Sequence, residues 1–89
     1  TAYRIGLVHE VASADALDAT VDALLADLLS AGPTAVRAAK DLIHHVATKE
    51  IDDLLSRDTA QRIAHQRVTA EAKEGLSAFL EKRKPGWRT

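Results

Sequence analysis

The end of the chain carries the residue types best suited to bind a ligand. Phe79 lies three residues before Lys82, and Arg83 and Lys84 follow directly. Residues three apart share one face of a helix, so an aromatic ring and an ammonium group there would meet the same ligand. Such a pair suits a molecule that joins phosphate groups to an adenine ring. The same spacing also fits a plainer interpretation, in which Phe79 packs in the core and the cations are solvated at a helix end.

No residue pattern indicates catalysis or metal binding. His44 and His45 are adjacent, and adjacent residues of a helix point about 100° apart, so the two side chains do not converge on one ion. Neither has a second histidine or a carboxylate four residues later, as a zinc site on a helix would require. The sequence has no Gly-rich phosphate loop, no G-x-S-x-G motif and no cysteine. We therefore predict no catalytic residue, no metal site and no cofactor within these residues.

The charge distribution limits the classes of partner. The formal net charge is −1, which argues against a chain built to bind nucleic acid or an anionic membrane. The first long segment is acidic, with Asp15, Asp18, Asp22 and Asp27, whereas positive charge gathers at the end. No apolar run approaches the about 20 residues that span a bilayer, and the first residues lack the features of a signal peptide. The absence of cysteine fits the cytoplasm.

Apolar residues recur at the helical period in four segments, which predicts an all-α fold of about four helices. The expected helices cover about residues 15–30, 33–47, 51–64 and 69–84. Gly32 and Pro33 separate the first two, because Pro is tolerated only in the first turn of a helix. Pro85 and Gly86 stop the last one. Of the hydrophobic residues, 46 % of the chain, many are alanines, so we expect a thin core.

The first residues differ from the rest. The segment TAYRI followed by Gly6 is typical of the last turn of a helix that ends in a left-handed glycine. Leu7 to Val11 is apolar and partly β-branched, which predicts a short strand. A single strand needs partners elsewhere. We therefore interpret residues 1–12 as the end of a core that precedes this chain, and residues 13–89 as a helical region for oligomerisation.

Three short motifs, in order and well separated, resemble the C-terminal region of the enoyl-CoA hydratase/isomerase (crotonase) family. They are Gly6-Leu7-Val8 followed by Val11, Gly32-Pro33-x-Ala35 followed by Lys40, and E-G-x-x-A-F-x-E-K-R-x-P-x-W from Glu74 to Trp87. The resemblance covers essentially the whole chain. Each motif alone is weak, but together they make a specific match.

The resemblance implies a parent enzyme with a spiral ββα core that holds a thioester carbonyl in an oxyanion hole. A helical region then follows and builds trimers or dimers of trimers, and only that region matches these 89 residues. The family's catalytic glutamates lie in the core, so the catalytic spiral core is absent here and no catalytic residue is carried onto this sequence. We expect the segment alone to be inactive. The most frequent reaction of the family is the addition of water to a 2-trans-enoyl-CoA.

The resemblance also favours the ligand interpretation of the chain end. In related hydratases the phenylalanine of the A-F pair and the lysine of the E-K-R triplet approach the CoA bound by a neighbouring subunit. These positions match Phe79 and Lys82, whereas the match at Arg83 and Lys84 is less constrained. The expected partners are therefore an acyl-CoA thioester, which is the substrate, and further copies of the same protein. A free-standing helical interaction module without thioester chemistry stays open as an alternative.

Overall fold

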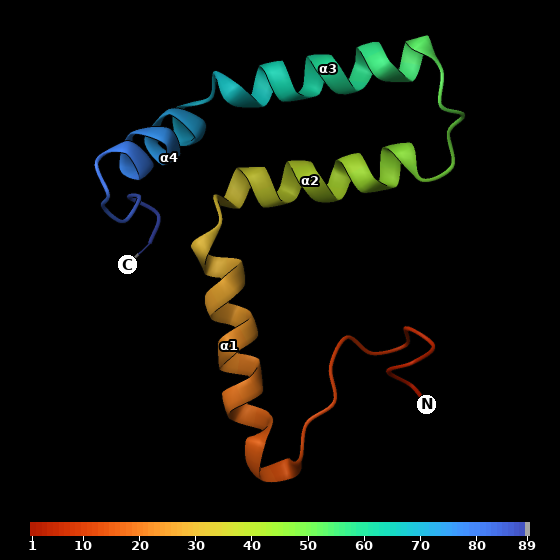
Figure 1. Cartoon of the computed structure of the whole chain (residues 1–89), viewed down its shortest axis with the longest axis vertical. Coiled ribbons are helices and arrows are strands. Elements are labelled where there is room, and N and C mark those ends of the chain that lie inside the picture. Colours follow the sequence, from red (N-terminus) through yellow and green to blue (C-terminus); the bar gives the residue numbers. More distant parts are fainter. Residues whose placement is uncertain (89) are drawn as a thin grey trace.

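The computed structural model describes residues 1–88 and contains four α-helices there (Figure 1). A short 3₁₀ turn, Ala14–Ala16, leads into α1, Leu17–Ser30, and the other helices are α2, Pro33–Val46, α3, Asp53–Arg67, and α4, Ala70–Leu80. The prediction of four helices is confirmed, and the first three begin and end close to their expected bounds. The fourth is shorter than expected, because it ends at Leu80 and not near Lys84.

The helices lie in a single thin layer. α2 and α3 run side by side as a hairpin (Figure 1). α4 lies at the open end of this hairpin, opposite the loop that joins α2 to α3, and α1 projects away from the start of α2 at the same end. The principal-axis extents are 47 × 39 × 15 Å, and the radius of gyration is 17.1 Å. A compact domain of this length would have a radius of gyration of about 12 Å. The fold is therefore spread out and has two open faces.

Almost no side chain is buried. Among residues 1–88 only Ala78 falls in the buried class, with 2 % of its surface exposed. The leucines and valine that form the apolar stripe of α1 remain 43–70 % exposed; they are Leu17, Val21, Leu24, Leu25, Leu28 and Leu29. A helix gains most of its stability from burying such a stripe. The chain by itself leaves the apolar face of α1 uncovered.

The expected strand at Leu7 to Val11 is not found, and residues 1–88 contain no strand at all. The reason is local hydrogen bonding. The backbone N–H groups of Leu7 and Val8 turn back to the carbonyl oxygen of Ala2, at 2.9 and 3.4 Å, so they are not extended for pairing. The predicted left-handed glycine is confirmed, since Gly6 has φ +78° and follows a turn of the chain.

Candidate functional site

The start of α4 is fixed by its own cap and by contact with α2. The Thr69 hydroxyl oxygen accepts a hydrogen bond from the backbone N–H of Ala72 at 3.2 Å, as expected for an N-cap residue. Glu71, in the first turn, reaches across to the start of α2. Its carboxylate accepts from the backbone N–H groups of Thr34 at 3.0 Å and Ala35 at 2.9 Å. One side chain therefore joins the N-termini of two helices.

The carboxylate of Glu71 occupies the N-terminus of α2, where free N–H groups and the helix dipole favour negative charge. Desolvation raises the pKa of Glu71, but hydrogen bonds from Thr34 and Ala35 and the charge of Arg37 outweigh it, so the pKa is lowered. Gly32 allows this approach, because a Cβ atom there would lie 2.8 Å from the Glu71 carboxyl carbon. The motif glycine at position 32 is thus explained by close packing.

α4 ends in a turn with two backbone hydrogen bonds. Lys82 N–H donates to the Phe79 carbonyl oxygen at 3.2 Å, and Arg83 N–H donates to the Ala78 carbonyl oxygen at 2.9 Å. This is the Schellman arrangement, which requires a left-handed residue after the last helical turn. Here that residue is Lys82, with φ +54°, the one non-glycine residue of positive φ within 1–88.

The same arrangement occurs once more within residues 1–88, with glycine at the left-handed position. Gly6 N–H donates to Tyr3 at 3.2 Å and Leu7 N–H donates to Ala2 at 2.9 Å, the same pattern of carbonyl acceptors. A side chain in the left-handed conformation costs about 1 kcal/mol relative to glycine. Lys82 therefore occupies a position where glycine would be more stable.

The helix end corrects one expectation. Because α4 stops at Leu80, Lys82 lies outside the helix, and Phe79 and Lys82 do not share a helical face. The turn links their backbones instead, through the hydrogen bond between Lys82 N–H and the Phe79 carbonyl oxygen. The link between the two residues is therefore a turn of the backbone and not the shared helical face that the spacing indicated.

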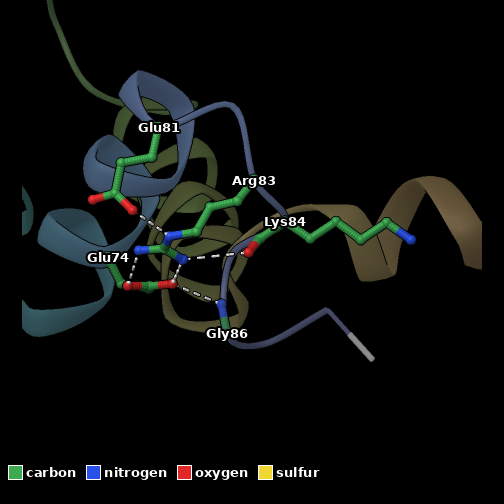
Figure 2. Close-up of polar contacts among 5 residues, drawn as sticks. All are labelled: Glu74, Glu81, Arg83, Lys84 and Gly86. Carbon is green, nitrogen blue, oxygen red and sulfur yellow. Dashed lines mark hydrogen bonds and ion pairs between the residues drawn. The ribbon is translucent and has the colours of Figure 1, made fainter.

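Arg83 is the centre of a polar cluster beside this turn (Figure 2). Its guanidinium donates to both carboxylate oxygens of Glu74, at 2.6 and 3.1 Å, and to Glu81 at 2.7 Å. The Glu74 carboxylate also accepts from the backbone N–H of Gly86 at 2.8 Å. Figure 2 shows the Lys84 side chain pointing away, while its carbonyl oxygen lies 3.3 Å from Arg83. Arg83 is thus engaged by protein groups and does not extend toward solvent as a free cation.

These contacts favour the charged forms of both Glu74 and Arg83, although the pair is partly exposed to solvent. Hydrogen bonds from Arg83 and then from Gly86 lower the pKa of Glu74 to about 2, and they outweigh the opposing effect of desolvation. Hydrogen bonds to Glu74 and Glu81 raise the pKa of Arg83 above its ordinary value. A bidentate guanidinium–carboxylate contact also fixes the geometry of both groups. The segment after α4 is therefore tied to α4 itself.

Trp87 completes this attachment. A Cβ atom at Gly75 would lie 3.0 Å from the Trp87 ring, and the indole N–H donates to the Ser30 carbonyl oxygen at 3.3 Å. Trp87 thus lies against α4 and bonds the last residue of α1. The close approach of the ring explains the glycine at position 75.

Most of the motif from Glu74 to Trp87 now has an internal role. Two motif side chains do not. The Phe79 side chain is 79 % exposed, and no hydrogen bond or ion pair of the Lys82 ammonium occurs within residues 1–88. The two residues predicted to bind a ligand are therefore both exposed, and a backbone hydrogen bond links them at the end of α4.

Comparison with known proteins decides the family. The profile described as enoyl-CoA hydratase/isomerase matches residues 1–89, the whole chain. The chain belongs to the enoyl-CoA hydratase/isomerase family. It is 37 % identical over 83 residues to crotonyl-CoA hydratase of Syntrophomonas wolfei, which covers 93 % of this chain. It also superimposes, with a TM-score of 0.90 and 41 % identity over 97 % of its length, on a crystal structure assigned as an enoyl-CoA hydratase/isomerase (crotonase) from Legionella pneumophila.

The matched region is a part of each relative. The chain spans 32 % of the length of the Syntrophomonas protein and 33 % of the Legionella protein. The helical architecture described above is therefore that of a segment of the crotonase fold. The four helices and their arrangement agree with that fold, whereas the strand expected at the start does not occur.

Another cluster of this family member was not predicted from the sequence. His45, on α2, lies 2.9 Å from Asp58 of α3, and Arg62 contacts the same carboxylate oxygen at 2.8 Å. A hydrogen bond from Arg62 is the largest cause of the lowered pKa of Asp58. The four-residue spacing of Asp58 and Arg62 was a visible signal, but the approach of His45 depends on how the hairpin closes.

Within 1–88 no group of three or more His, Cys, Asp or Glu side chains is placed to hold a metal ion. None of the helices in the same range is long and apolar enough to cross a membrane.

Proposed function

We propose that this chain is the C-terminal helical region of an enzyme that adds water to 2-trans-enoyl-CoA thioesters, with the catalytic groups in the remainder of the enzyme. The proposal is supported by family membership and by the relative named crotonyl-CoA hydratase, of which the chain spans 32 %. The 89 residues alone are then inactive. The enzyme is cytoplasmic and uses the acyl-CoA as substrate without a further cofactor.

The helical region assembles subunits in this proposal, as a trimer or a dimer of trimers. The supporting observation is the apolar stripe of α1, which stays 43–70 % exposed at its leucines and valine. Such a stripe needs cover from the rest of its own subunit or from another copy. The isolated chain should therefore show no cooperative unfolding transition by circular dichroism. A cooperatively folded monomer in sedimentation, without affinity for CoA, would favour the free-standing interaction module.

The region also contributes to the CoA site, and Phe79 and Lys82 are the contacting residues. One observation supports this above all others, namely that a backbone hydrogen bond joins these two motif residues, and that Phe79 is 79 % exposed while the Lys82 ammonium has no partner within residues 1–88. An ammonium group pairs with phosphate oxygens, and an exposed aromatic ring stacks on a base. CoA carries both groups, so one ligand can satisfy both side chains.

Steady-state kinetics of the full-length enzyme with crotonyl-CoA tests this proposal. Lys82→Ala should raise KM about fivefold with a smaller change in kcat, because the lost contact is distant from the reacting atoms. Lys84→Ala is the matched control, since its side chain points away from the cluster in Figure 2. An unchanged KM for Lys82→Ala would leave Lys82 as a solvated cation at a helix end.

A further inference from the structure

Lys82 adopts a left-handed backbone conformation that is less stable for a lysine than for a glycine. The turn at Gly6 shows that the same hydrogen-bond pattern forms with glycine at the left-handed position. At the end of α4 a lysine stands there, with φ +54°. Strain of this kind persists only where surrounding contacts determine the backbone. Contacts of the neighbouring residues must therefore hold the backbone at Lys82.

The polar cluster supplies these contacts. Arg83, the next residue, is held by both oxygens of Glu74, and Gly86 N–H is held by the same carboxylate at 2.8 Å. Glu74 belongs to α4, the helix that also carries Phe79. The ion pair therefore ties the backbone after Lys82 directly to the helix that presents Phe79 (Figure 2).

The same cluster also limits which cation is available. Arg83 is shared by two carboxylates, Glu74 at 2.6 Å and Glu81 at 2.7 Å, so its donors are engaged by side chains of the protein. The Lys82 ammonium has no such partner within residues 1–88. Lys82 thus keeps its ammonium group available to a ligand, and its backbone is bonded to that of Phe79.

We propose that Glu74 and Arg83 are positioning residues, whose bidentate ion pair holds Lys82 in its left-handed conformation beside Phe79 for contact with CoA. This inference rests on the proposed CoA contact of Lys82 and Phe79. Neither Glu74 nor Arg83 touches the ligand; both act through the backbone of the turn. Loss of the pair lets the turn relax, and the ammonium group then spends less time in the binding position.

A double-mutant cycle in the full-length, assembled enzyme tests the inference. Binding of free CoA is measured by titration calorimetry, and kcat and KM are measured with crotonyl-CoA. Glu74→Gln and Arg83→Gln break the pair from opposite sides, so a folding defect in one variant leaves the other as a test. Each should raise the Kd for CoA about fivefold and change kcat less than twofold. Arg83→Lys, which retains one charged contact, should give an intermediate Kd.

The decisive comparison is made in the Lys82→Ala background. There Glu74→Gln and Arg83→Gln should change the Kd less than twofold, because the residue through which they act is gone. Effects that multiply with that of Lys82→Ala would overturn the inference, as would single variants that bind CoA as well as the wild type while Lys82→Ala binds weakly. A Lys82→Ala enzyme with unchanged Kd would instead overturn the proposed CoA contact itself.

Discussion

Lys82 donates its backbone N–H to the carbonyl oxygen of Phe79 at 3.2 Å, and this bond joins the backbones of the two proposed CoA-contacting residues. The contact belongs to the turn that ends α4 and not to the helix. Any change that alters the turn therefore alters the relative position of the aromatic ring and the ammonium group. This relationship leads to predictions that separate stability from ligand binding.

Replacement of Lys82 by glycine should have opposite effects on stability and on binding. In the full-length enzyme, the unfolding free energy of Lys82→Gly should exceed that of Lys82→Ala by about 1 kcal/mol, because glycine adopts positive φ without steric cost. Both variants should lose the same affinity for CoA, since both lack the ammonium group. Denaturant unfolding and calorimetric titration with CoA measure the two quantities. A glycine variant that retains wild-type affinity would show that Lys82 has only a backbone role.

Phe79→Ala should weaken CoA binding about tenfold, because stacking on a base contributes about 1–3 kcal/mol. Leu80 offers a matched control, since it is 78 % exposed where Phe79 is 79 % exposed and lies next to it on α4. Leu80→Ala should change the Kd less than twofold. Equal losses in the two variants would point to general packing at the end of α4 rather than to stacking on the ligand.

The sequence predicted the helices well, for identifiable reasons. Gly32 and Pro33 mark the boundary between α1 and α2 at the observed residues, and Thr69 caps α4 as expected. The strand at Leu7 to Val11 was predicted wrongly, because β-branched composition does not supply a pairing partner. The end of α4 was also placed too late. Pro85 and Gly86 are strong stop signals, but the chain had already left the helix at Lys82, a residue type that gives no such signal.

The candidate site was predicted in part. Phe79 and Lys82 followed from the motif, and their role at a CoA site stays a prediction; the structure adds the backbone hydrogen bond between them. The ion pair of Glu74 with Arg83 was not predicted, because nine residues and a left-handed turn separate them. On a continuous helix a separation of nine does not bring side chains together. Only the reversal of the chain at Lys82 makes this contact possible.

The pH dependence of the unfolding free energy of the full-length enzyme should show the contribution of the Glu74 ion pair. Its folded-state pKa of about 2 lies below the ordinary value of an unfolded glutamate, so its contribution is complete above about pH 4.5 and is lost as the pH falls toward 2. Glu74→Gln should remove this part of the pH dependence. Denaturant unfolding of the wild type and the variant between pH 2 and pH 5 measures it. Parallel pH profiles for the two proteins would contradict the ion pair.

The contact between Glu71 and the start of α2 predicts that substitutions at Gly32 and Glu71 affect the unfolding free energy of the full-length enzyme in a non-additive way. Gly32→Ala should destabilise the protein by about 1 kcal/mol, since alanine is a poor N-cap and its Cβ atom displaces the Glu71 carboxylate. In a Glu71→Ala background the same substitution should cost less, because no carboxylate remains to be displaced. A double-mutant cycle of unfolding free energies checks this. Additive losses would show that Glu71 does not depend on the space at Gly32.

A crystal structure of the full-length protein with bound CoA tests the central proposal most directly. The measured quantities are the distances from the Lys82 ammonium nitrogen and from the Phe79 ring to the nearest CoA atoms. We expect the ammonium nitrogen within hydrogen-bond distance of a phosphate oxygen and the ring in van der Waals contact with the adenine, across a boundary between two subunits. Well-ordered CoA with both side chains facing solvent or packed against protein would contradict the account.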